Sequence, residues 1–280
     1  MGLSRKIIIV WSPRSCGATA VATSLAWYLS RKEKNNRVAL LDLNINTPDI
    51  RTYFKIKESP TTGLDRVLPM LKSGQLKEAD LLGRMVKNGP LFILAGTMEL
   101  ERTISFEDRE MDLLLGVTQA LFNIVVVDVP PGLDNMVTLY AISRGEEVWC
   151  IVDQNVAKLD YLLRWLQVLP EGTIFREGHM RLIVNSYRPD DGPSWQQVAR
   201  ALDWPVAGTL PYVPRAHDCL LSGQPLMVED GHFAAALTRN VEGLETNAAG
   251  LWANGLLRLK KLIGRREKAH EAGDHSSQAL

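Results

Sequence analysis

The sequence is poor in cysteine, has no net charge, and carries an apolar run of only four residues directly after Lys6 near its N-terminus. Its three cysteines, Cys16, Cys150 and Cys219, form neither a metal-ligand spacing nor an even disulfide framework, which favours a reducing cytoplasm. Lys plus Arg and Asp plus Glu each total 32, so no overall field draws the chain to nucleic acid or to a membrane. The run of residues 7–10 is too short for a signal peptide or a spanning helix. We therefore expect a cytoplasmic protein without sequence-specific nucleic-acid binding.

Short apolar runs rich in Val and Ile recur along the chain. The 280 residues, 46% of them hydrophobic, are enough for one large α/β domain. The runs show no alternation, as expected for strands covered on both faces, and the stretches between them have helical periodicity. The pattern predicts an α/β fold with a doubly wound, mostly parallel sheet and helices on both faces. The predicted strands are residues 7–10, 38–41, 91–94, 124–127, 148–152, 182–184 and 206–210.

Polar residues follow several of these strands, at the sheet edge where such folds bind ligands. The stretch "SPRSCGATA" (residues 12–20) has the layout of a phosphate-binding loop, because Gly17 permits close backbone approach and the next helix offers its N-terminal dipole to an anion. Thr19 is the natural magnesium ligand, and Asp128, which ends the strand in "NIVVVDVPPG", would hold the same ion through water. The loop alone is equally typical of an ordinary strand-to-helix turn. Asp128 favours a nucleotide.

Five motifs over residues 5–245 resemble the ParA/MinD family of deviant Walker A P-loop ATPases, and most closely its CpaE/TadZ branch, which organises pilus and secretion machinery. They are "SPRSCGATAVATSLA", "ALLDLNINTPDI", "FNIVVVDVPPGLDN", "RLIVNSYRP" and "GTLPYVP". The resemblance implies ATP or ADP with Mg²⁺, held between the two chains of a homodimer. It implies adenine contact by Asn185 and closure of the segment containing Pro211 over the base. The implied phosphate contacts come from Arg14, Ser15, Cys16, Gly17, Ala18, Thr19 and Ala20.

The chain departs from the family pattern at its cations and at one carboxylate. The signature lysine of the family falls on Pro13, and the Walker lysine falls on Ala18. Arg14 either replaces part of the lost charge or is a solvated loop residue. The second Asp of the Asp-x-Asp motif is Asn44, whose amide orients water but does not accept its proton, so we expect hydrolysis to be slower by orders of magnitude. Asp42 keeps the first position, either as a catalytic group or as a carboxylate that bonds backbone amides.

These features predict a nucleotide-binding protein with weak or absent ATP hydrolysis. Its expected function is to position or scaffold a membrane-associated machine such as a type IV or Tad pilus, whose proteins would be its partners. Three alternatives stay open: an active MinD-like or flagellar ATPase, a DNA-partition ATPase and a bacterial tyrosine autokinase. The balanced charge argues against DNA, and the absence of tyrosine after residue 247 argues against the autokinase.

The composition changes near residue 247, which predicts a ParA/MinD-like domain over residues 1–247 and a basic amphipathic helix with a disordered tail over 248–280. At 100° per residue, Leu251, Trp252, Leu256, Leu259, Leu262 and Ile263 fall within an arc of roughly 140°, and Leu257 lies outside it. Six basic residues and one acidic residue give this segment a formal charge of +5. It either attaches the protein to the inner face of the membrane, as in MinD, or packs on the domain or a partner. The residues expected to contact lipid are Leu251, Trp252, Leu256, Leu259, Lys260, Lys261, Leu262 and Ile263.

Overall fold

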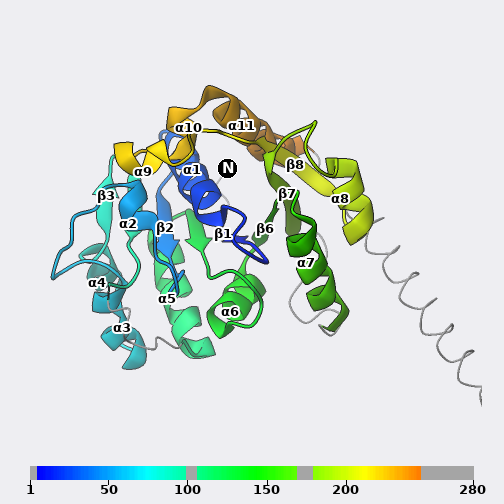
Figure 1. The fold of residues 1–280 in the computed structure, drawn as a ribbon. Helices are drawn as coiled ribbons and strands as arrows, with labels where there is room; N and C mark the ends of the chain where they lie inside the picture. Colours follow the sequence, from blue (N-terminus) through cyan, green and yellow to red (C-terminus); the bar gives the residue numbers. More distant parts are fainter. Residues whose placement is uncertain (1–4, 99–105, 169–178, 247–280) are drawn as a thin grey trace, which may run out of the picture.

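A computed structural model describes residues 5–98, 106–168 and 179–246. In this part of the chain, one sheet of eight strands runs in the order β3-β4-β2-β5-β1-β6-β7-β8. Figure 1 shows helices on both sides of the sheet. Adjacent strands are parallel except for β3, which is antiparallel to β4. The strands are β1 (Lys6–Trp11), β2 (Val38–Asp42), β3 (Val86–Asn88), β4 (Leu91–Leu94), β5 (Ile124–Asp128), β6 (Glu147–Val152), β7 (Met180–Tyr187) and β8 (Val206–Pro211).

The predicted α/β class and all seven predicted strands are confirmed. The sequence analysis missed only β3 among the described strands, because its three residues "VKN" contain no apolar run. A signal for it was present, since Gly89 and Pro90 form a two-residue turn between the paired residues Asn88 and Leu91, and Gly89 has φ +58. The short β3 pairs with the edge strand β4 and lies far along the sheet from β1.

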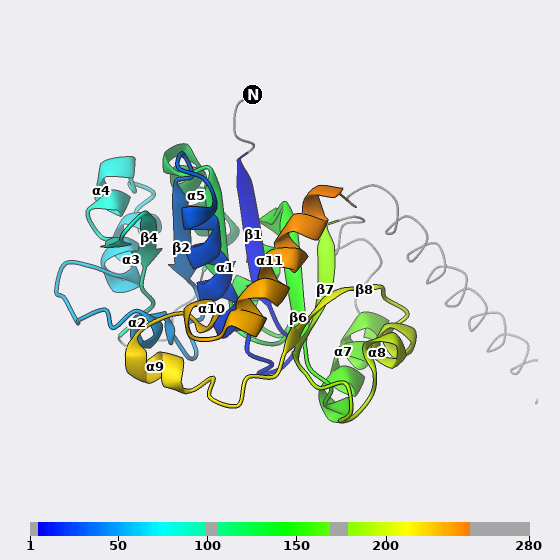
Figure 2. The same cartoon turned by 90° about the horizontal axis from the view of Figure 1, so that it is seen from above.

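The helices form two layers that bury the two faces of the sheet. One hydrophobic cluster contains residues from α3, α4, α5, α6, α7 and α8, and the other contains residues from α1, α2, α10 and α11. In the view from above, α1, α10 and α11 lie over the central strands (Figure 2). The helices are α1 (Ala18–Lys32), α2 (Ile50–Tyr53), α3 (Leu64–Lys72), α4 (Glu78–Leu82), α5 (Asp108–Leu121), α6 (Met136–Arg144), α7 (Val156–Val168), α8 (Trp195–Leu202), α9 (Asp218–Ser222), α10 (Leu226–Glu229) and α11 (Gly231–Thr246).

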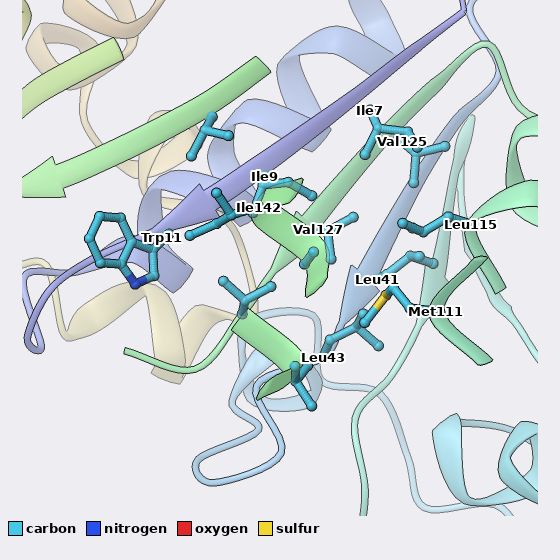
Figure 3. Packing of buried hydrophobic residues seen from close by; sticks show 14 of the residues in the cluster. Ile7, Ile9, Trp11, Leu41, Leu43, Met111, Leu115, Val125, Val127 and Ile142 are labelled. Carbon is cyan, nitrogen blue, oxygen red and sulfur yellow. The ribbon is translucent and has the colours of Figure 1, made fainter. Parts of the chain in front are cut away.

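The strand β1 is apolar without alternation because both of its faces are buried. Successive side chains of a strand point to opposite faces, so Ile7, Ile9 and Trp11 join one cluster while Ile8 and Val10 join the other. Figure 3 shows side chains of the first of these clusters, with Ile7 and Ile9 near Val125 and Val127 of β5. Because both faces are covered, every residue from Ile7 to Trp11 is buried.

No helix within the described ranges is long and apolar enough to cross a membrane. The basic amphipathic segment predicted at residues 250–268, with the lipid contacts predicted over residues 251–263, lies outside the described residues. So does the predicted boundary near residue 247. Both stay predictions.

Candidate phosphate-binding site

The sheet brings the predicted loop and the two predicted acidic motifs to one edge. The strand β5 lies between β1 and β2, with Asp128 in register with Val10 on one side and Asp42 on the other. The loop of residues 12–17 follows β1 directly and leads into α1. Parallel strands present their carboxyl ends at the same edge, so the sequence neighbours of each strand end become neighbours in space.

A hydrogen bond joins the two predicted magnesium residues. Thr19 Oγ1 donates to Asp128 Oδ2 at 2.8 Å, although the two residues are 109 positions apart in the chain. The loop is also tied to the turn that follows Asp128, because the Gly132 amide donates to the Ser12 carbonyl at 3.0 Å. The structure therefore places the candidate Walker A and Walker B motifs in direct contact.

Gly17 gives the loop its shape. It caps α1 in the left-handed region, at φ 82 and ψ 28, a conformation that side chains rarely adopt. A Cβ at this position would lie 2.6 Å from Nδ2 of Asn185. Asn185 donates from that nitrogen to the Cys16 carbonyl at 2.8 Å. The predicted adenine contact of Asn185 stays a prediction, and the contact seen in the structure is with the loop backbone.

The helix α7 supplies a cation that the sequence analysis missed. Lys158 donates from Nζ to the Ser15 carbonyl at 2.7 Å and pairs with Asp153 at 2.5 Å. Figures 1 and 2 show the loop beside α7. A signal was available in the sequence, because the carboxylate of Asp153 directly follows the predicted strand 148–152. Asp153 and Lys158 reach the loop only because β6 lies next to β1, and this strand order cannot be inferred from the sequence.

Arg14 also rests on α7. Its guanidinium carbon lies 3.9 Å from the centroid of the Tyr161 ring, within the range of a cation–π contact. Arg14 and Ser15 are exposed, while Pro13, at the position of the family's signature lysine, is buried. These contacts thus place two cations at the loop: Arg14, which belongs to the loop, and Lys158, which belongs to α7.

Asp42 and Asp128 form a buried acidic pair. Burial raises the pKa of Asp42 to about 7. Burial, reinforced by the charge of Asp42, raises the pKa of Asp128 well above its ordinary value. Asp42 accepts hydrogen bonds from the backbone amides of Asn44 and Ile50, each at 3.2 Å. These bonds agree with the interpretation of Asp42 as a carboxylate that orders the backbone.

Asn44 is buried and its side chain is engaged. Its Oδ1 accepts from both the backbone amide and the hydroxyl of Thr47, each at 3.3 Å. The side-chain amide of Asn44 therefore stabilises the turn after β2. The structure brings Asn44 to the same strand end as Asp42, and its predicted influence on an attacking water stays a prediction.

The site fits a magnesium ion that is shared with a phosphate ligand. Oδ1 of Asp128 is buried and has no hydrogen-bond partner within the described part of the chain. A buried carboxylate oxygen of this kind is satisfied by a cation or by a water that a cation holds. Within the same residues, no group of three or more His, Cys, Asp or Glu side chains could hold a metal. Thr19 and Asp128 thus suit an ion whose other ligands are phosphate and water.

The far side of the site is built from the ends of β7 and β8. Pro211 pairs with Tyr187 across these strands. Just beyond, the guanidinium carbon of Arg188 lies 3.6 Å from the centroid of the Tyr212 ring. Gln154, which follows β6, accepts from the Arg188 amide at 2.7 Å. Asn185 and Pro211 therefore lie on adjacent strands at the edge that carries the loop.

Comparison at the level of sequence finds a distant match to a known protein. No protein-family model matches the chain. Among curated proteins, an iron–sulfur cluster carrier protein from Rickettsia bellii is 24% identical over 226 residues, a match that covers 79% of this chain and 66% of that protein, just under two thirds of its length.

Solved structures of ParA and MinD proteins share the fold. A ParA family ATPase from Chlorobium tepidum superimposes with a TM-score of 0.72 at 16% identity, covering 84% of this chain and 97% of the other. MinD from Aquifex aeolicus, solved in complex with MinC, gives 0.69 at 17%, covering 88% and 98%. MinD from Pyrococcus horikoshii, solved with Mg-ADP, gives 0.67 at 19%, covering 87% and 96%. The chain therefore has the P-loop fold of the ParA and MinD ATPases, as predicted.

Proposed function

We propose that this protein binds ATP or ADP with Mg²⁺ at the loop of residues 12–19. The observation that carries the proposal is the bond between Thr19 and Asp128, beside a left-handed Gly17 and an unpartnered buried oxygen of Asp128. The Thr19 hydroxyl would hold the ion and Asp128 would hold its water. Bound Mg²⁺ would neutralise charge between the outer phosphates. The Mg-ADP in the MinD structure from Pyrococcus horikoshii supports this ligand.

Hydrolysis should be weak or absent. Ala18 removes the lysine that neutralises charge on the transferred phosphate. Asn44 replaces the second carboxylate of its motif, and its amide oxygen is already shared by two donors of Thr47. Both carboxylate oxygens of Asp42 accept hydrogen bonds from backbone amides, which makes this group a weaker base toward an attacking water. We infer that the bound nucleotide acts as a structural ligand that controls assembly.

The assembly we propose is a homodimer with nucleotide between its chains, in the CpaE/TadZ manner. It would position a membrane-associated machine such as a pilus, with the machine's proteins as partners and residues 250–268 at the membrane. The MinC:MinD complex supports a protein partner for this fold. Cluster carriage, the activity named for the Rickettsia protein, finds no support in the described residues, because Cys16, Cys150 and Cys219 are all buried and no group of three or more His, Cys, Asp or Glu side chains among these residues could hold a metal.

Two variants test the ligand assignment. Thr19→Ala and Asp128→Ala should each abolish magnesium-dependent binding of labelled ATP, because each removes a hard oxygen ligand or the group that orders its water. Thr118→Ala is the matched control: Thr118 is a helical threonine of α5 whose hydroxyl donates to Leu114 of its own helix at 2.6 Å. It should bind like the wild type. Unchanged binding by both site variants would show that the assignment is wrong.

A further inference from the structure

The outer side of the loop is attached to neighbouring elements at two successive carbonyls. The Ser15 carbonyl accepts from Lys158 of α7 at 2.7 Å, and the Cys16 carbonyl accepts from Asn185 of β7 at 2.8 Å. Each donor is more than 140 residues away in the sequence, so these bonds tie the loop to the tertiary structure. Both bonds therefore act on peptide groups at the centre of the loop.

These bonds fix the direction of the adjacent amides. A trans peptide is planar, with its C=O and N–H on opposite sides, and the described residues contain no cis peptide. Holding the Ser15 carbonyl toward α7 turns the Cys16 N–H away from it. Holding the Cys16 carbonyl toward Asn185 does the same for the Gly17 N–H. With Gly17 in the left-handed region, successive N–H groups of this kind form a concave anion site.

The loop needs such bonds because it fixes little of this geometry itself. Glycine accepts either sign of φ at small cost, so a peptide next to Gly17 turns over readily when nothing holds it. A carbonyl that turned toward a phosphate would repel it. Ala18 offers no charge to offset that repulsion.

We propose that Lys158 and Asn185 are positioning residues that hold the Ser15–Cys16 and Cys16–Gly17 peptides with their N–H groups toward a bound phosphate. The proposal rests on the proposed binding of nucleotide at this loop. In this chain, hydrogen bonds from α7 and β7 hold the loop in a conformation that binds phosphate, although the loop has neither lysine of the family pattern.

Lys158 is itself held in place. Its ammonium pairs with Asp153, and its side chain is 28% exposed. The other oxygen of Asp153 accepts from the Asn155 amide at 3.0 Å, and Asn155 in turn accepts from the Ala157 amide at the start of α7. The cation is thus fixed by the same turn that begins the helix, and its geometry toward Ser15 is set before any ligand arrives.

The first test is a titration with labelled ATP and Mg²⁺ on the full chain. Lys158→Met and Asn185→Ala should each weaken binding by about tenfold or more, the size expected when a hydrogen bond from a charged or buried donor is lost. Lys158→Arg keeps a charged donor and should stay closer to the wild type. Arg164→Met, which removes a cation from the same helix that pairs with Asp160 at 2.7 Å, is the control and should bind normally. If Lys158→Met binds as the wild type does, the positioning proposal is wrong, whatever its melting temperature.

The second test needs no nucleotide. In the ligand-free protein, the amide resonances of residues 15–17 should be single in the wild type and in Lys158→Arg, and should broaden or double in Lys158→Met as the freed peptide samples two orientations. Unchanged resonances would contradict the proposal. If they change while the wild type binds no ATP, the positioning of the loop stands and the nucleotide assignment falls.

Discussion

The loop of residues 12–17 has neighbours on two sides, β5 with β2 and β6 with β7, and only the first side resembles an ordinary P-loop. On the side of β5 and β2, both candidate metal-binding residues are present: Thr19 bonds Asp128, and Asp42 lies in register beside Asp128. The loop itself carries neither lysine of the family pattern, and on the side of β6 and β7 its Ser15 and Cys16 carbonyls accept hydrogen bonds from Lys158 and Asn185. The comparison teaches that this chain keeps the candidate metal-binding residues of the family pattern although its loop has neither of that pattern's lysines.

The largest effect should come from restoring both the Walker lysine at position 18 and the carboxylate at position 44. Ala18→Lys alone should strengthen ATP affinity by about tenfold or more, because a lysine would then contact the phosphates. Ala18→Lys combined with Asn44→Asp should be needed before hydrolysis appears, since a base must also act on the water. Phosphate release by purified protein measures this. Turnover by Ala18→Lys alone would show that Asn44 is not a block to catalysis.

Membrane attachment is the next largest effect and concerns residues 250–268. Each basic residue near an anionic surface contributes about 1 kcal/mol, so the full chain should pellet with anionic vesicles at low salt. Truncation after residue 247, or Trp252→Glu with Leu259→Glu, should remove most of that binding. A truncated form that pelleted equally would rule out this segment as the anchor.

The buried pair Asp42 and Asp128 predicts that the stability of the ligand-free protein depends on pH. The folded-state pKa of Asp42 is raised to about 7 and that of Asp128 is raised as well, whereas an unfolded Asp titrates near about 3.9. Between these values the folded state holds more protons than the unfolded state, so stability should fall as pH rises from about 4 to about 7. Thermal melts across this range measure it. A rising or flat profile would contradict the buried acidic pair.

Asp128→Asn sharpens the same point. It removes one of two like charges from a buried site, so it should raise the melting temperature by about 2–4 °C for each kcal/mol gained. The gain should be larger near pH 8 than near pH 5, where the wild-type pair holds its protons. The same variant should lose stabilisation by Mg²⁺ and ATP. A variant less stable than the wild type at high pH would show that Asp128 is not under electrostatic strain.

The smallest effect concerns the cysteines. Burial raises the pKa of Cys16 to about 12, and it also raises the pKa of Cys150 and of Cys219. The thiolate is the reactive form, so the folded protein should resist iodoacetamide at about pH 8, and the unfolded chain should react at all three positions. Mass spectrometry counts the labels. Rapid labelling of Cys16 in the folded state would show that the loop is open at that residue.

The sequence predicts most of the fold because burial on both faces leaves an apolar run at each central strand. It misses β3, whose three residues need no apolar run. It also predicts that Thr19 and Asp128 come together, since Asp128 ends one predicted strand and the loop before Thr19 follows another at the same edge of the sheet. It does not find Lys158, because that contact depends on which strands are neighbours and on a side chain that crosses from α7 to the loop. Strand order is a property of long-range packing that a single sequence does not state.

The central claim is that this loop holds ATP without consuming it. The most direct test is to incubate the purified full chain with radiolabelled ATP and Mg²⁺, separate the protein from free nucleotide, and identify what remains bound. We predict intact ATP on the protein with no phosphate released above background, and no bound label for Asp128→Ala. Bound ADP with steady phosphate release, or no bound nucleotide in the wild type, would contradict the claim.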